Sequence, residues 1–94
     1  MKLEKDLEKK IVKWLKENGW WQVKLESPTT RGVPDRICVK NGIVVFVEIK
    51  RLGKSARTYQ RYVIKTLFKQ GANVFLCDNF KFFKEVMNDY TKQV

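Results

Sequence analysis

The dipeptide Asn41-Gly42, set between two runs rich in β-branched residues, constrains the fold of this chain more than any other feature. A type I′ turn needs positive φ at both central residues, and Asn-Gly meets that need best in a two-residue hairpin loop. We therefore expect residues 35–40 and 43–48 to form antiparallel strands. Lys40 then lies opposite Ile43, so the numbers of paired residues sum to 83.

This register brings two acids and a lysine together at the open end of the hairpin. Asp35 is expected directly opposite Glu48. Directly opposed residues share a sheet face, with Cβ atoms about 4.5–5.5 Å apart, so their carboxylates repel each other unless a cation lies between them. A hard divalent ion accepts carboxylate oxygens and removes that repulsion. Lys50, two residues after Glu48, leaves the strand on the same face.

Hydrophobic periodicity and breaker residues define the remaining elements. Gly19 and Gly71 are expected to end the first two helices, and Ser55 to cap the start of the second. The expected elements are a helix over 1–18, a strand over 20–26, the hairpin of 35–50, a helix over 55–70, a strand over 72–77 and a helix over 80–90. The order α-β-β-β-α-β-α predicts one α/β domain over 1–94, a mixed sheet with a central hairpin flanked by helices.

Three polar side chains interrupt the apolar pattern of the helices. At about 100° per residue, Glu4 points within the core-facing sector of the first helix, and Glu8 lies nearer the edge of that sector. A carboxylate aimed at a core is costly unless it is paired or metal-bound, although a first-turn acid also suits the helix dipole. Gln60 points among apolar residues, either as a core glutamine bonded to backbone or as a group facing the acidic end of the hairpin. We expect the rest of that hairpin face, including the pair Ile37 and Phe46, to be core.

Charge and composition narrow the function. The net charge is +10, from 20 Lys and Arg against 10 Asp and Glu, which favours nucleic acid as a partner. The chain has no histidine, which excludes His-based nucleases, Ser-His and Cys-His catalysis and most zinc sites. Hydrolysis must then use carboxylates, lysine and a bound ion. The sequence lacks a signal peptide and a membrane span, so we expect a cytoplasmic protein with Cys38 and Cys77 reduced in the core.

Three segments together resemble a known nuclease family. These are Gly32-Val33-Pro34-Asp35-Arg36, then Val47-Glu48-Ile49-Lys50, then Gln60. In order and spacing they look like the PD-(D/E)xK nuclease superfamily and, within it, the small stand-alone form of the VRR-Nuc (virus-type replication-repair nuclease) family. The resemblance extends from Glu4 to about Cys77. It implies a restriction-endonuclease-like fold and an active metal-dependent nuclease.

The same resemblance implies a role for each residue of the motif. Asp35 and Glu48 resemble the metal-binding acids of the family, and Lys50 its catalytic lysine. Glu4 resembles the glutamate of the N-terminal helix, with Glu8, one turn later, as the competing assignment. Two further groups complete the expected site, Gln60 as a catalytic residue and the carbonyl of Ile49 as a metal ligand. The expected ion is Mg²⁺ or Mn²⁺, present once or twice, and the expected products carry a 5′ phosphate and a 3′ hydroxyl.

Basic and polar residues beside this site are candidates for DNA contacts. Phosphate contacts give affinity without reading sequence, although a solvated helix face is the alternative for some of them. The candidates are Lys24, Ser27, Arg31, Arg51, Lys54, Arg57, Arg61 and Lys65. Stand-alone members of the family resemble four-way-junction resolvases, so we expect branched DNA and a homodimer in a bacterial or phage-infected cell, with some of the many aromatic side chains at the interface. The alternatives are a flap, end or nonspecific nuclease, a DNA-binding module that never cuts, and a protein-interaction subunit.

Overall fold

The structure, a computed structural model, describes residues 2–50 and 53–92. Its elements follow the order expected from the sequence. They are α1 (Lys2–Glu17), β1 (Trp21–Lys24), β2 (Arg36–Lys40), β3 (Ile43–Ile49), α2 (Thr58–Lys69), β4 (Asn73–Cys77) and α3 (Phe80–Lys92). None of the described helices is long and apolar enough to cross a membrane.

The hairpin of β2 and β3 has the predicted turn and register. Asn41 and Gly42 adopt φ values of 50° and 82°, as a type I′ turn requires. Lys40 pairs with Ile43 and, at the other end of the ladder, Arg36 pairs with Val47, so the pairing sum of 83 is confirmed. The strands lie in the order β1-β2-β3-β4, with β3 and β4 parallel and the other pairs antiparallel, which makes the sheet mixed as expected.

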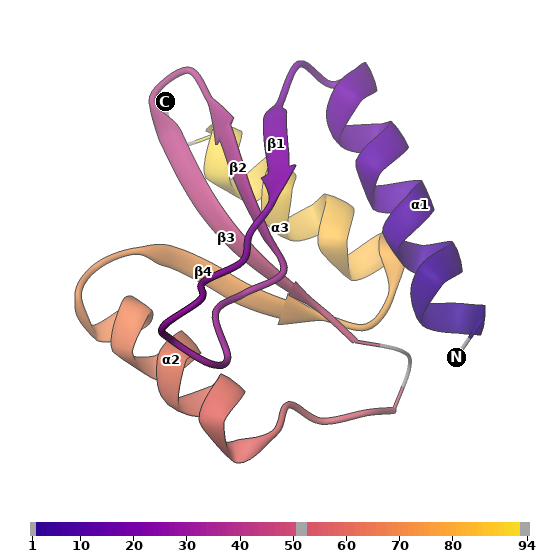
Figure 1. The fold of residues 1–94 in the computed structure, drawn as a ribbon. Helices are drawn as coiled ribbons and strands as arrows, with labels where there is room; N and C mark the ends of the chain where they lie inside the picture. The colour runs from indigo at the N-terminus through magenta and orange to yellow at the C-terminus, as the bar shows by residue number, and fades with distance from the viewer. Residues whose placement is uncertain (1, 51–52, 93–94) are drawn as a thin grey trace.

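The three helices cover the two faces of the sheet unequally. Helices α1 and α3 pack against each other and against one face, while α2 packs against β4 from the other side (Figure 1). Two helices therefore bury one face, whereas a single short helix at one edge leaves much of the opposite face uncovered. This asymmetry decides where the core lies.

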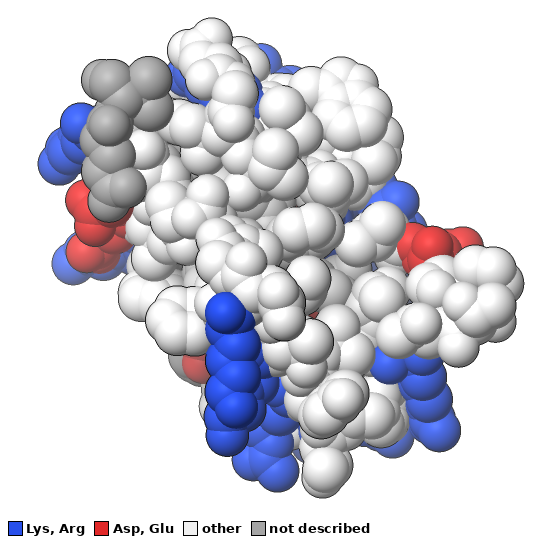
Figure 2. Space-filling model, turned by 90° about the vertical axis from the view of Figure 1, so that its left-hand side faces the viewer, with Lys and Arg blue, Asp and Glu red and all other residues white. Residues whose placement is uncertain are grey.

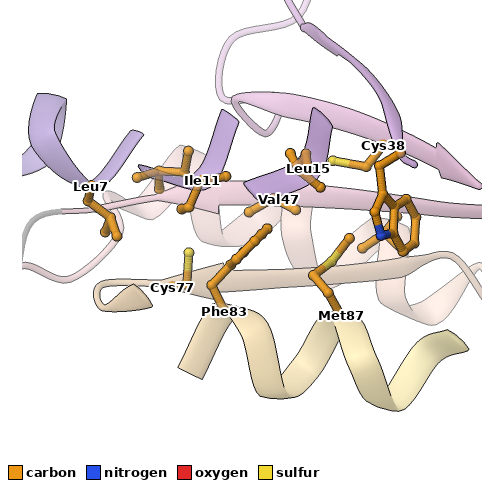
Figure 3. Close-up of a cluster of buried hydrophobic side chains, with 11 residues drawn as sticks. Leu7, Ile11, Leu15, Cys38, Val47, Cys77, Phe83 and Met87 are labelled. Carbon is orange, nitrogen blue, oxygen red and sulfur yellow. The ribbon is translucent and has the colours of Figure 1, made fainter. Parts of the chain in front are cut away.

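The hydrophobic core lies between the sheet and the pair α1 and α3 (Figure 3). Ile11, Leu15, Phe83 and Met87 are buried there against one side of β3. Cys38 and Cys77 are free thiols within the same cluster, as predicted. Burial raises the pKa of each thiol to about 12, so both stay protonated and unreactive at neutral pH.

The expectation that the Asp35–Glu48 face of the hairpin is core was wrong. Ile37 and Phe46 are only half-buried, and Val44 is 39% exposed. The fully buried apolar residues of the hairpin, such as Val45 and Val47, point to the opposite face. Strand β3 is apolar on both faces, so alternation alone does not indicate which face receives two helices.

Glycine ends α1 and α2 in the expected way, but α2 begins later than expected. After α1, the N–H of Trp20 donates to the carbonyl of Leu15 at 2.9 Å, with Gly19 at φ 80°, which is a Schellman motif. Helix α2 starts at Thr58 with Arg57 as its N-cap, so Ser55 is not the cap. The reason is that Gln60 Oε1 accepts a hydrogen bond from the Arg57 N–H at 2.9 Å.

Candidate active site

Asp35 lies in a bend immediately before β2 and is held there by backbone on both sides. Its Oδ2 accepts a hydrogen bond from the Ile49 N–H at 2.8 Å, and its carbonyl accepts one from the Leu25 N–H at 2.8 Å. The last pair of the β2–β3 ladder is Arg36 with Val47. The same register, extended by one residue, places Asp35 opposite Glu48. The sequence argument therefore places this acid where the structure has it.

Glu48 is a carboxylate buried in the middle of the sheet, with 1% of its surface exposed. Its Oε2 accepts a hydrogen bond from Gln60 Nε2 at 2.9 Å and lies 3.4 Å from Lys50 Nζ. Its Oε1 is buried and has no hydrogen-bond partner among the described residues. A buried polar atom without a partner destabilises the fold by about 1–3 kcal/mol, so this oxygen is suited to a ligand that the protein alone does not provide.

Both acids bind protons more readily than ordinary carboxyls. Desolvation, together with the charge of Asp35, raises the pKa of Glu48 to about 7, although Lys50 acts in the opposite direction. Burial also raises the pKa of Asp35, against the hydrogen bond from Ile49, and the charges of Glu8 and Glu4 add to that rise. The site therefore favours a cation or a proton between the two carboxylates.

The donors present fit a hard divalent ion. Such an ion prefers carboxylate and carbonyl oxygen, and Glu48 Oε1 is such an oxygen without a protein partner. Within residues 2–50 and 53–92, no cluster of three or more Asp, Glu, Cys or His side chains is placed to hold a metal. Asp35 and Glu48 are a pair of carboxylates that the hairpin register brings to one end of the sheet.

Gln60 bridges the start of α2 and the buried acid. Its Oε1 accepts from the Arg57 N–H, and this bond orients the amide so that Nε2 faces Glu48. The sequence left two roles open for Gln60, and the structure shows both in part. Its amide hydrogen-bonds to backbone and also faces the acidic end of the hairpin. The cap of α2 therefore fixes the side chain that donates to Glu48.

The helical wheel placed Glu4 nearer the core than Glu8, but in the structure Glu8 is the more buried of the two. Glu8 is half-buried, with Oε2 3.0 Å from Arg36 Nη2, while Glu4 is exposed. Arg36 also donates from Nη1 to Gln22 Oε1 at 2.7 Å. The sequence pattern predicted no role for Arg36 beyond its place in the motif next to Asp35. The charge of Glu8 raises the pKa of Asp35 more than that of Glu4 does.

The loop before Asp35 docks on the first turn of α2. Gly32 has φ 92°, and a Cβ at this position would lie 2.8 Å from both the ring and the carbonyl oxygen of Tyr59. The Arg31 guanidinium lies over the same ring, 4.2 Å from its centroid. Tyr59 is a residue that the sequence analysis missed, and the only signal for it was the glycine that leaves room for it.

The structure distributes the predicted DNA-binding residues over β1, α2 and the loops that precede β2 and α2. Ser27 supports its own loop, because its Oγ accepts from the Thr30 N–H at 3.0 Å. Arg51 lies outside the described residues. The others are exposed: Lys24 on β1, Arg31 in the loop over Tyr59, Lys54 and Arg57 before α2, and Arg61 and Lys65 on α2. Figure 2 shows the left-hand side of Figure 1, where Lys and Arg gather in the lower part, at the height of α2.

Half of the twelve aromatic side chains are buried in the core or packed against it. Trp20 and Phe83 are buried, and four others pack against the core: Trp14, Phe75, Phe80 and Tyr90. Trp21 is 59% exposed and Phe82 is 44% exposed. Trp21 pairs with Val39 on the uncovered face of the sheet, where the neighbouring Val44 is also exposed. This apolar strip, Trp21, Val39 and Val44, continues the face that carries Asp35 and Glu48.

Comparisons with known proteins find similarity over most of the chain. The chain is 36% identical over 77 residues to a protein described as "Putative nuclease p44" from Acyrthosiphon pisum secondary endosymbiont phage 1, a match that covers 81% of this chain and 83% of that protein. A solved structure described as a VRR_NUC domain superposes with a TM-score of 0.85 at 26% identity, over 93% of this chain and 96% of that one. No family model matches the sequence.

Proposed function

The chain belongs to the VRR-Nuc family of nucleases, and from this premise we propose that it is a metal-dependent, structure-selective endodeoxyribonuclease. The observation that carries the proposal is Glu48, a buried carboxylate with one unpaired oxygen beside Asp35 and Lys50. A DNA-binding module gains nothing from two buried acids, because acids repel phosphate. A nuclease needs them to hold a cation at the scissile phosphate.

We assign the metal ligands from this donor set. Asp35, Glu48 and the carbonyl of Ile49 would hold one or two Mg²⁺ or Mn²⁺ ions, with Glu4 joining directly or through water and Glu8 as the alternative helix acid. When bound, the ion supplies a Lewis acid that activates water and offsets the charge developing on the phosphate. The rise in the pKa of Glu48 supports this set, because a cation relieves the same repulsion that a proton relieves.

The remaining residues act on the attacking water and the phosphate. Lys50 orients the water and offsets negative charge on the pentacovalent phosphorus, with its ammonium held 3.4 Å from Glu48 Oε2. Gln60 positions Glu48 through its 2.9 Å hydrogen bond, so it keeps the unpaired oxygen aimed at the site. Hydrolysis breaks the bond between phosphorus and the 3′ oxygen, and leaves a 5′ phosphate and a 3′ hydroxyl.

The proposed substrate is branched DNA, cut by a homodimer. Two symmetric cuts in a four-way junction require two active sites, which a two-fold dimer provides. The apolar strip of Trp21, Val39 and Val44 supports the dimer, since a second copy would cover it. Exposed cations in the loop before β2, before α2 and on α2 would hold phosphates beside the site: Arg31, Lys54, Arg57, Arg61 and Lys65. Trp21→Lys should then lower the mass measured by light scattering from dimer to monomer, whereas Phe82→Lys should leave it unchanged.

The test of the activity is cleavage of end-labelled DNA in four forms: four-way junction, flap, linear duplex and single strand. Each is incubated with Mg²⁺, Mn²⁺ or EDTA, using wild type, Glu48→Gln and Lys50→Met. We expect paired symmetric nicks in the junction with either ion, none in EDTA, and at least a 100-fold lower rate for both variants. Lys81→Met, an exposed lysine on α3, serves as the control for the charge change.

The possible results separate the alternatives. Equal cutting of all four forms would keep the active site but reject selectivity for branches. Cleavage that survives in Glu48→Gln would reject the assignment of this acid. If DNA binds but is not cut under any of these conditions, the chain is a DNA-binding module and the nuclease proposal is rejected.

A further inference from the structure

A groove lined by cations lies on the side of the sheet that α1 covers, outside the site described above. Its volume is about 570 Å³. The cations lining it are Lys5, Lys9, Lys13 and Lys16 of α1, Lys24 of β1 and Arg36 of β2. We name this surface the α1 groove. The four lysines of α1 have no part in the acidic site, so the nuclease function proposed above does not account for them.

The spacing of these lysines makes one continuous stripe. They stand at intervals of four, four and three residues, and at 3.6 residues per turn such positions face the same side of a helix. At 1.5 Å per residue, the eleven steps along α1 from Lys5 to Lys16 span about 16 Å. That length corresponds to about five nucleotides along one strand of duplex DNA, at about 3.4 Å each.

Few carboxylates lie beside these lysines to neutralise their charge. Glu8 is the single carboxylate among the described residues that line the α1 groove, and it lies 3.0 Å from Arg36 Nη2. Asp6 lines a different hollow, next to Phe80. A solvent-exposed helix face usually mixes both signs of charge, whereas this one carries four lysines and one carboxylate, Glu8, which is paired with Arg36. A polyanion is the partner that such a surface fits.

The α1 groove begins at the same end of the strands as the proposed catalytic acids. Arg36 directly follows Asp35, and Lys24 pairs with Arg36 across β1 and β2. Glu8, which pairs with Arg36, acts electrostatically on Asp35. The near end of the α1 groove therefore lies at the acidic end of the hairpin but on the opposite face of the sheet, and its far end, Lys16, lies about three turns beyond Lys5 along α1.

We propose that the α1 groove binds the phosphodiester backbone of the DNA substrate on one side of the scissile bond, while the cations near α2 hold the other side. This proposal rests on the nuclease function proposed above. The lysines act as point charges on phosphate oxygens, and their contribution is independent of base sequence. Arg36 Nε, buried and without a described partner, leaves one further donor near the entrance.

The test compares two variants that remove the same number of charges. One carries Lys5→Gln, Lys9→Gln, Lys13→Gln and Lys16→Gln. The control carries the same change at four exposed lysines outside the α1 groove, namely Lys10, Lys69, Lys81 and Lys92. Binding of a fluorescein-labelled four-way junction is measured by anisotropy in EDTA between 50 and 200 mM salt, so that no cleavage occurs. Far-ultraviolet circular dichroism checks the fold, and two double variants, at Lys5 with Lys9 and at Lys13 with Lys16, replace the quadruple variant if it does not fold.

We expect the α1-groove variant to bind at least 10-fold more weakly at 100 mM salt. Its plot of log Kd against log salt should be shallower by up to about 3.6, since each of four phosphate contacts contributes about 0.9 to the slope. The control should change the slope by less than about 1, and each double variant by about half of the full effect. Equal losses in the two quadruple variants, or no loss in either, would overturn the proposal.

The outcome is separable from that of the nuclease proposal. With saturating junction and Mg²⁺, the α1-groove variant should keep the wild-type kcat and show a raised KM, because its acids are intact. If wild type cuts no DNA at all, the nuclease proposal fails, while the anisotropy measured in EDTA still decides whether the α1 groove binds a phosphodiester backbone.

Discussion

Glu48→Gln should abolish cleavage and yet stabilise the metal-free protein. Burial raises the pKa of Glu48 from the ordinary 4.5 to about 7. A group whose pKa is higher in the folded state contributes stability at low pH, and loses that contribution as the pH rises through the folded-state value. At about 1.4 kcal/mol per pKa unit, ionised Glu48 makes the folded state less stable at pH 8 than at pH 4.5 by about 3 kcal/mol.

Glutamine keeps the size and one donor-acceptor pair of the side chain but carries no charge to desolvate. The variant should therefore exceed wild type in free energy of unfolding by up to about 3 kcal/mol at pH 8, and by less than about 1 kcal/mol at pH 5. The assay is urea denaturation in EDTA at pH 5, 6, 7 and 8, followed by tryptophan fluorescence. Glu85→Gln, at an exposed position of α3, is the matched control and should show no such trend.

A gap between the variant and wild type that does not change with pH would refute this reasoning. So would a glutamine variant that is less stable than wild type at pH 8. Either result would mean that Lys50 and Gln60 fully offset the cost of burying the charge.

Three further predictions follow from the same geometry. Adding Mg²⁺ should raise Tm more at pH 8 than at pH 6, because protons compete with the ion for Glu48, and equal shifts at both pH values would contradict this. Gln60→Met should lower both cleavage rate and Mn²⁺ affinity by about 10–100-fold, as removal of a ligand-orienting hydrogen bond does elsewhere, and unchanged titration of Mn²⁺ would argue against a positioning role. Gly32→Ala should destabilise the fold by about 1–3 kcal/mol more than Gly71→Ala, because both have positive φ but only the Cβ at Gly32 meets Tyr59; equal denaturation midpoints would contradict the contact.

Local chemistry made the centre of the site predictable. The turn at Asn41-Gly42 sets the register by its own backbone preference, and register places Asp35 opposite Glu48 whatever packs around the hairpin. Glycines end α1 and α2 for the same kind of reason, because their positive φ is a property of the residue itself. These features depend on neighbours in sequence, so a single sequence is enough to infer them.

The start of α2 shows where local signals compete. Ser55 is a good cap by residue preference, yet Arg57 takes the position because Gln60 bonds its N–H. Gln60 is oriented at the same time by Glu48, which is distant in sequence. The choice of Arg57 over Ser55 as the N-cap thus depends on a tertiary contact, which the cap preferences of single residues do not include.

The sequence by itself determined the hairpin register, the order of the elements and the pairing of the two acids. Only the tertiary structure decided which face of the sheet is core, because β3 is apolar on both sides and the choice depends on where α1 and α3 pack. The contacts of Glu8 with Arg36 and of Gly32 with Tyr59 were also decided only by the tertiary structure. Turn conformation depends on a few neighbouring residues and can be inferred from the sequence. Packing depends on contacts between segments that are remote in sequence, so it is known only from the tertiary structure.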